Sequence, residues 1–155
     1  MYKFSKYSTI TYDNKTINDL TSQLNFNREM LNNSIYFVNY NIKDGDTPDK
    51  ICQSLYDDAS LDWVLLYINN IIDPIYDWPL LPDELTSYCV NKYGSSYVYS
   101  VHHYELDDKV VSTGTTGSTP ITNYDYESSL NDAKRPIKLP TEKFMNEFIF
   151  SYENL

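Results

Sequence analysis

Histidine and cysteine are the side chains in this sequence best suited to metal or nucleophilic chemistry. His102 and His103 are the two histidines, and as neighbours in a β-rich segment we expect them to point to opposite faces, one packed inward and one exposed. Two such ligands cannot chelate one metal ion from one surface. Cys52 and Cys89 lie in apolar stretches with helical spacing, which favours two reduced, buried thiols over a disulfide.

Carboxylates are the other source of chemistry. Asp44, Asp46 and Asp49 resemble part of a calcium-binding loop, but the twelve-residue ligand spacing and the closing glutamate are absent. The sequence also lacks a glycine-rich phosphate loop, a G-x-S-x-G motif and a Cys–His pair at a recognisable spacing. A carboxylate pair assembled by folding would allow hydrolysis, yet solvated acidic surfaces are far more common. The sequence therefore predicts no enzymatic activity, no metal and no cofactor.

Length and charge narrow the classes of function. The chain has 155 residues, 41% of them hydrophobic, which is enough for one domain or two small ones. Its 22 acidic side chains outnumber the 12 basic ones, and residues 41–93 alone carry 10 acidic against 3 basic groups. A net charge of −10 disfavours binding to a nucleic-acid backbone. Neither a signal peptide nor a membrane span is predicted.

Aromatic residues point to protein contacts. Tyrosine occurs 16 times, and its apolar ring with a polar tip suits large, partly hydrated interfaces, although an AT-rich genome would also enrich tyrosine. Trp63 and Trp78 have three possible roles. Core packing is favoured, and the others are a platform for a sugar ring and an anchor in a protein interface.

The elements that position these residues are clearest in the middle of the chain. A strand is predicted over residues 35–43, and a short helix over 48–56 follows with Thr47 as its N-cap. Ser60 is expected to cap a second helix that ends near residue 70. A third helix over 82–93 is expected to end at Gly94.

The flanking regions give weaker signals. Predicted elements are a strand at residues 9–12, an ambiguous segment at 17–24, a hairpin of 97–105 with 110–111 turning at Asp107-Asp108, a mobile loop at 113–120, a helical turn at 130–135, an extended segment at 137–139 and a terminal helix from about 141. The fold class is therefore α+β.

The middle region resembles a LysM module. The resemblance lies in the Asp44-Gly45-Asp46-Thr47 turn, the two following helices and the exit Asn70-Ile71-Ile72-Asp73-Pro74. It departs from that module where the second strand is expected, because Trp78-Pro79-Leu80 leads into the third predicted helix.

Further motifs extend the resemblance to residues 35–155, and they are Trp78-Pro79-Leu80, Lys92-Tyr93-Gly94, Val101-His102-His103-Tyr104 and the segment from Leu130 to Ile137. Together they resemble the LysM-like baseplate wedge subunit of contractile-tailed bacteriophages. The resemblance implies a non-enzymatic structural protein of the virion that is assembled in the host cytoplasm. It would clamp or connect larger wedge subunits around the tail tube in a six-fold assembly, without nucleic acid, membrane or small-molecule partners.

This resemblance also implies an organisation. A docking segment would span residues 1–34, a LysM-like strand–helix–helix core with an added helix would span 35–94, and residues 95–155 would hold the hairpin, the loop and the terminal helix. The segments at both ends would lie extended over neighbouring chains. The expected interface residues are Trp63, Tyr67, Trp78, Tyr97, Tyr99 and Tyr104, with Arg135 as an orienting ion-pair donor.

A glycan-binding LysM module that recognises N-acetylglucosamine polymers of cell walls is the alternative. Its groove would be formed by Asp44, Gly45, Asp46, Thr47, Asn70 and Ile72. The absent second strand and the absent export signal count against it.

Overall fold

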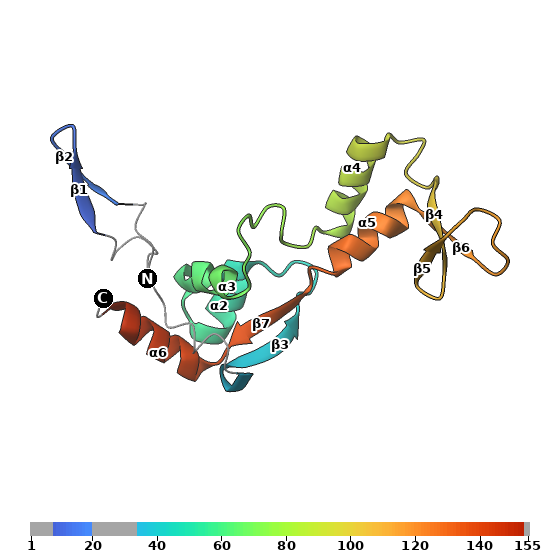
Figure 1. The fold of residues 1–155 in the computed structure, drawn as a ribbon. Coiled ribbons are helices and arrows are strands. Elements are labelled where there is room, and N and C mark those ends of the chain that lie inside the picture. The colour runs from blue at the N-terminus through green and yellow to red at the C-terminus, as the bar shows by residue number, and fades with distance from the viewer. Residues whose placement is uncertain (1–7, 20–33, 154–155) are drawn as a thin grey trace. The chain divides into compact units, whose positions relative to one another are not determined.

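The fold is mixed α+β, as the sequence predicts (Figure 1). The computed structural model describes residues 8–19 and 34–153. Contacts divide the chain into two compact units: unit 1 takes in residues 1–41, 46–74 and 137–155, and unit 2 takes in 42–45 and 75–136. Unit 1 is therefore built from segments on both sides of unit 2 in the sequence. The division at residues 34 and 94 expected from the resemblance stays a prediction.

A hairpin of two short strands contains the predicted strand near the N-terminus. β1 (Thr9–Tyr12) pairs with β2 (Lys15–Asn18) in antiparallel register. Asp13 and Asn14 join them with positive φ angles of 49° and 56°, which suit the right-handed twist of a two-residue turn. The ambiguous segment at 17–24 ends β2, and its residues 20–24 lie outside the described part of the chain.

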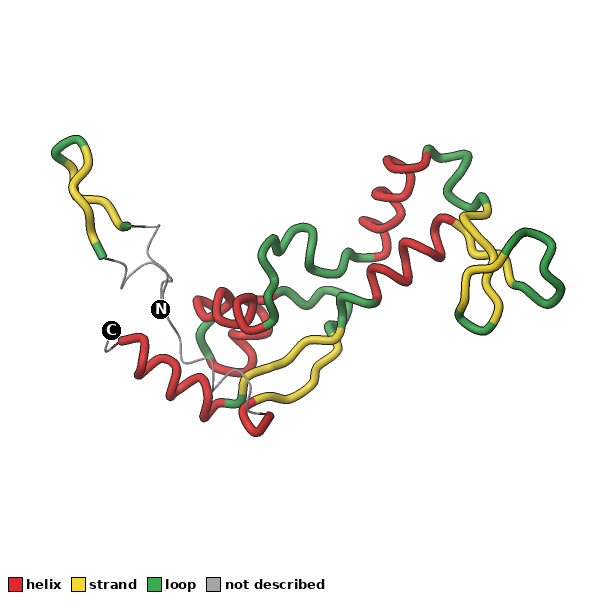
Figure 2. Tube along the Cα trace, in the orientation of Figure 1, coloured by secondary structure: helices red, strands yellow, loops and turns green. Residues whose placement is uncertain are grey.

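Unit 1 also contains a second two-stranded sheet, besides the β1–β2 hairpin. The strand predicted at 35–43 is shorter than expected, since η1 (Ser34–Tyr36) is a 3-10 turn and β3 spans Phe37–Asn41. Its partner is β7 (Pro136–Pro140), which confirms the predicted extended segment at 137–139. β3 thus pairs with a strand from far along the chain, and Figure 2 shows the two strands side by side.

Three of the unit 1 helices follow β3, and α6 follows β7. They are α2 (Pro48–Tyr56), the 3-10 turn η2 (Ala59–Leu61), α3 (Asp62–Ile68) and α6 (Glu142–Glu153). These helices confirm the sequence predictions at 48–56, at 60–70 and from 141.

Two helix caps differ from the predictions. Thr47 occupies the N-cap position of α2, but its hydroxyl bonds to the Asp49 carboxylate rather than to the helix backbone. Asp58, not Ser60, caps η2, because its carboxylate accepts the Ser60 backbone N–H at 2.9 Å. A carboxylate is the stronger acceptor of the two.

The core of unit 1 forms where these helices meet β7. Its buried apolar side chains are Ile51, Cys52, Leu61, Val64, Leu65, Ile137, Leu139, Phe144, Met145, Phe148 and Tyr152. The predicted stripe of α6 is confirmed, because Phe144, Phe148 and Tyr152 are each at most 4% exposed.

Unit 2 combines two helices with a three-stranded sheet in the order β5-β4-β6. Its elements are α4 (Pro82–Tyr93), β4 (Val101–Leu106), β5 (Lys109–Val111), β6 (Thr119–Thr122) and α5 (Asn123–Asp132). A small core holds Leu85, Cys89 and Val98, with Leu80 and Tyr124 against it.

The predictions for unit 2 are confirmed in part. α4 ends at Gly94, which has a φ of +84°, and Asp107 and Asp108 form the hairpin turn. The residues at 97–100 form turns instead of a strand. The loop predicted at 113–120 ends at 118, because β6 begins at Thr119. α5 is a full helix instead of a turn at 130–135.

Within the described ranges, no helix combines the length and apolar composition that crossing a bilayer requires.

Candidate functional site

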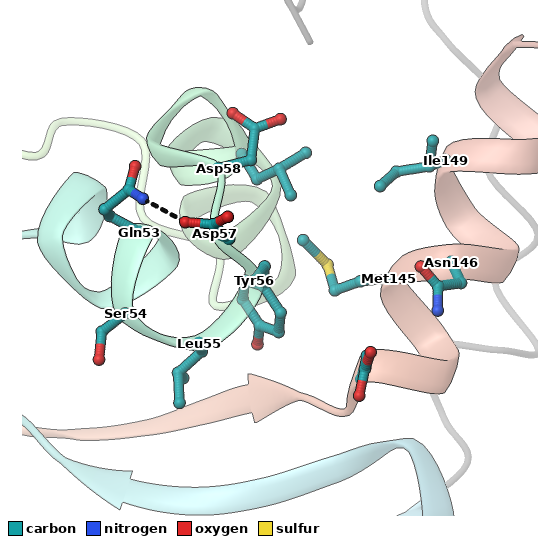
Figure 3. A pocket seen from close by; sticks show the side chains of 11 residues that line it. Gln53, Ser54, Leu55, Tyr56, Asp57, Asp58, Met145, Asn146 and Ile149 are labelled. Carbon is teal, nitrogen blue, oxygen red and sulfur yellow. Dashed lines mark hydrogen bonds between the residues drawn. The ribbon is translucent and has the colours of Figure 1, made fainter.

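A groove in unit 1 lies between the C-terminal end of α2 and one side of α6 (Figure 3). Its volume is about 420 Å³. The residues that line it are Gln53, Ser54, Leu55, Tyr56, Asp57, Asp58, Leu61, Glu142, Met145, Asn146 and Ile149. Apolar side chains form one part of this lining and three carboxylates another, so the groove is suited to a ligand with both apolar and cationic groups.

The α2 side of the groove is shaped by the end of that helix. Asp57 stops α2 in the left-handed conformation, with a φ of 56°, and the Gln53 side-chain amide donates to its carboxylate at 2.8 Å. The Tyr56 hydroxyl donates to the Pro140 carbonyl, which ties α2 to β7. Burial raises the pKa of Tyr56, so the hydroxyl keeps the proton that this bond needs.

The α6 side is held by aromatic packing. Phe144 contacts Phe37 of β3 with ring centroids 5.1 Å apart, and Trp63 of α3 contacts Phe148 and Tyr152 at 5.7 and 5.5 Å. Offset and tilted aromatic pairs of this kind stabilise a core beyond the area that they bury. The packing fixes which face of α6 lines the groove.

The six predicted aromatic anchors fall into two groups. Tyr67, Tyr97 and Tyr99 are exposed, at 41%, 63% and 70%. Trp78 is 8% exposed and Tyr104 is half-buried, so both belong largely to the packing of unit 2. The half-buried Trp63 packs within unit 1, as described above.

Arg135 is bound within its own unit. Its guanidinium donates to the Asp44 carboxylate, the Asp132 carboxylate and the Ile42 carbonyl, at 2.8, 2.8 and 2.9 Å. These bonds raise the pKa of Arg135, the Asp132 bond contributing most and the Asp44 bond next. The charge predicted to orient a partner chain therefore also joins segment 42–45 to the end of α5.

The two histidines differ from the sequence prediction. A bulge lies between Val101 and His103 where β4 pairs with β6, and it brings the two rings to the same side, with Nδ1 atoms 2.7 Å apart. His102 stacks on Tyr126 at 4.1 Å, and His103 contacts the Glu105 carboxylate at 2.7 Å. The expectation of opposite faces is wrong because a bulge breaks the two-residue period of the strand.

A buried carboxylate that sequence analysis did not single out lies in unit 2. Glu127 on α5 is 5% exposed and accepts from Lys92 Nζ at 2.7 Å and from the Tyr93 hydroxyl at 2.6 Å. Burial alone would raise the pKa of Glu127, but the two hydrogen bonds outweigh it and lower the pKa overall. The hydrogen bonds of Glu127 with Lys92 and Tyr93 join α5 to α4. No local sequence signal indicates this contact.

The residues of the alternative glycan groove are divided between the units. Asp44 and Gly45 belong to unit 2, and Asp46 and Thr47 belong to unit 1. Asp46 accepts from the Tyr40 hydroxyl at 2.7 Å. Asn70 has a φ of 54° after α3, and Ile72 is 92% exposed in the following loop.

In the part of the chain that the structure describes, no three His, Cys, Asp or Glu side chains lie close enough together to hold a metal ion. Cys52 and Cys89 are both buried and unpaired with each other.

Comparison with known proteins identifies the family. The model of the family described as base plate wedge protein 53 matches residues 3–111, which is more than half of the chain. The baseplate wedge protein gp53 of Enterobacteria phage T4 is 24% identical over 181 aligned positions, covering 94% of this chain and 91% of that protein. This chain therefore belongs to the phage base plate wedge protein 53 family and is a structural subunit of a tail baseplate.

Proposed function

We propose that this chain connects larger wedge subunits around the tail tube of a contractile phage tail while the baseplate assembles. The family supports a structural role in the baseplate, and the surface of the two units supports the connecting role. The chain would join a six-fold assembly in the host cytoplasm and act there by binding, without catalysis.

The balance between exposed and buried apolar residues carries this proposal. Among the described residues, nineteen large apolar side chains are exposed, against sixteen apolar side chains that are buried. Single exposed apolar residues are normal on protein surfaces, but here they outnumber the core. A chain with two small cores and such a surface gains stability by burying that surface against partners.

Five of these exposed residues lie in two short segments. Ile72, Ile75 and Tyr76 lie within residues 72–76, after α3, with exposures of 92%, 75% and 73%. Tyr97 and Tyr99 lie in the turns between α4 and β4. Exposed tyrosines of this kind are common as anchors in protein interfaces. We therefore propose Tyr97 and Tyr99, together with Tyr67, as the main anchors.

The remaining predicted interface residues have a supporting part in this proposal. Trp63, Trp78 and Tyr104 would hold the anchor-bearing segments in place through their packing, and Arg135 would keep segment 42–45 in position through its ion pairs. The net charge of −10 argues for protein partners over nucleic acid.

Assembly tests the proposal directly. Phage lacking this gene would be complemented with the wild-type chain or with Tyr97→Ser/Tyr99→Ser, and the particles examined by cryo-electron microscopy and tail sedimentation. We expect the wild-type chain in the baseplate and a large loss of complete tails with the variant. The control, Asp108→Asn/Lys109→Ser, changes two exposed polar residues of the same unit, with asparagine suited to the left-handed φ of residue 108, and should assemble normally.

Two results would contradict the proposal. One is wild-type particles whose baseplates lack this chain. The other is a baseplate in which the chain contacts a single subunit, because a connector must contact at least two.

A further inference from the structure

We infer that the groove between α2 and α6 binds a segment of another wedge subunit in which a lysine or arginine stands beside a large apolar side chain. This inference rests on the proposed function, since it names the chemistry of one partner surface. The volume of the groove, its apolar floor and the charge at its rim each support it.

The floor of the groove is apolar and firmly held. The apolar surface is offered by Leu55 of α2, which is 50% exposed, and by the half-buried Ile149 of α6. Leu61 and Met145 are 2% and 1% exposed and belong to the core behind them. Figure 3 shows Met145 and Ile149 projecting from α6 toward α2. The volume of about 420 Å³ lies within the range of about 300–1,000 Å³ that binding pockets occupy. An apolar side chain inserted here would displace water from a surface that is already shaped by the core.

The rim of the groove is acidic on both sides. Asp57 lies at the end of α2, where Gln53 orients its carboxylate, and Glu142 lies in the first turn of α6. The described residues that line the groove include no lysine and no arginine. Two carboxylates from different helices, above an apolar floor, favour a cation at the rim and an apolar group beneath it.

The charge of the unit 1 segment that contains α2 acts in the same direction. Residues 46–74 carry 6 acidic groups and 1 basic group. Such a field attracts a basic segment before contact and disfavours an acidic one. Charge complementarity therefore selects a basic and apolar segment as the occupant.

Charge removal with a matched control tests the rim. Asp57→Asn/Glu142→Gln keeps side-chain size, and asparagine tolerates the left-handed φ of residue 57. The control, Asp108→Asn/Glu147→Gln, removes the same charges from another left-handed turn position and from the same helix, away from the groove. Binding is measured to the wedge subassembly of the same phage, purified without this chain.

We expect the groove variant to bind about tenfold more weakly at low salt, with a smaller difference at high salt. The control variant should bind within about twofold of the wild type. Equal affinity of the groove variant and the wild type would overturn the inference.

A steric variant tests the groove independently of charge. Asn146→Trp fills the groove from an exposed position on α6, and Ser151→Trp places the same ring on α6 outside it. We expect the first to abolish binding and the second to retain it, with equal helical circular dichroism and thermal midpoints showing that both are folded. Retained binding of a folded Asn146→Trp would contradict the inference.

Photo-crosslinking identifies the occupant in assembled baseplates. With Asn146→p-benzoylphenylalanine, we expect a crosslink to a wedge-subunit peptide that contains a lysine or arginine next to an apolar residue. A crosslink to residues 1–33 of this chain, or to an acidic peptide, would overturn the inference. If the wild-type chain itself fails to join the subassembly, the proposed function fails; if it joins and the groove variants bind equally well, the groove inference fails alone.

Discussion

The side-chain amide of Asn131 bonds both backbone polar groups of Leu80, accepting its N–H at 2.7 Å and donating to its carbonyl at 3.0 Å. In unit 1, the Asn69 amide makes the same pair of hydrogen bonds with the backbone of Lys138, at 2.7 and 2.9 Å. In each unit an asparagine thus supplies the pairing that a neighbouring strand would give. Asn131 thereby pairs backbone groups of a residue outside the helices and strands, and Asn69 pairs backbone groups of β7.

Removing the Asn131 amide should destabilise unit 2. Asn131 is 5% exposed, so Asn131→Ala leaves the N–H and carbonyl of the half-buried Leu80 without these partners, at a cost of about 2 kcal/mol. Urea unfolding followed by circular dichroism measures the change. Asn91→Ala, at an exposed position of α4, should change the free energy of unfolding by less than about 0.5 kcal/mol. Similar losses in both variants would contradict this role.

The Glu127 cluster predicts a dependence of stability on pH. Because the pKa of Glu127 is lowered in the folded chain from its ordinary value of 4.5, the carboxylate stabilises the fold above that pH. This contribution is lost as the pH falls below 4.5 through the lowered folded-state pKa. Glu127→Gln keeps the shape but not the charge, and should cost about 1–2 kcal/mol at pH 7.

The measurement that checks this prediction is the difference in stability between the wild type and Glu127→Gln as the pH falls. Urea midpoints of the wild type and of Glu127→Gln should differ at pH 7 and approach each other below about pH 4. Glu105→Gln, at the half-buried Glu105 of β4, serves as the comparison. A difference between wild type and Glu127→Gln that stays constant down to pH 3 would refute the ionic role of Glu127.

The two thiols should be unreactive in the folded protein. Burial raises the pKa of Cys52 to about 12 and also raises the pKa of Cys89 above its ordinary value. The thiolate is the nucleophile, so iodoacetamide at pH 8 should label neither residue in native protein and both in 6 M urea. Intact-mass spectrometry counts the added groups. Rapid labelling of Cys52 before unfolding would show that the core of unit 1 is open.

Alanine substitutions at Trp63 and Tyr97 should change the free energy of unfolding by different amounts, because Trp63 packs within the core of unit 1 and Tyr97 is exposed. Trp63 contacts Phe148 and Tyr152, so Trp63→Ala should cost about 3 kcal/mol of unfolding free energy. Tyr97 is 63% exposed, so Tyr97→Ala should cost less than about 0.5 kcal/mol in the isolated chain. Thermal unfolding measures both, and the reverse order would show that Trp63 faces solvent.

Local signals in the sequence were sufficient for the helices. Pro48 and Pro82 mark the starts of α2 and α4, and Gly94 ends α4 with its positive φ. The spacing of Phe144, Phe148 and Tyr152 indicates the buried face of α6. Each of these features depends on residues within one or two helical turns, which is why the sequence reveals them.

Features with a weak local pattern, or with distant partners, were missed. β6 contains Pro120 and follows a Thr/Gly-rich segment, so no strand pattern marks it. α5 has a capping signal, because Thr122 and Asp125 each bond the other's backbone N–H, but its interior is polar enough to hide the helix. Pairing of β3 with β7 requires knowledge of segments about a hundred residues apart.

The groove was hidden from sequence analysis for the same reason. One wall comes from residues 53–61 and the other from 142–149, and neither segment carries a motif of its own. Residue type predicted Tyr97 and Tyr99 as interface residues, and both are exposed. Their accessibility differs from that of Trp78 because Trp78 is drawn into the packing of unit 2, which residue type alone does not reveal.

The pairing of β3 with β7 sets an order of events during synthesis. Unit 2 lies between the two strands in the chain, so its helices and sheet leave the ribosome before β7 exists. At about 5–20 residues per second, β3 waits roughly 5–20 s for its partner. Unit 1 therefore closes late, and a stop codon at position 142 would remove α6 and with it the aromatic core that α2 and α3 pack against.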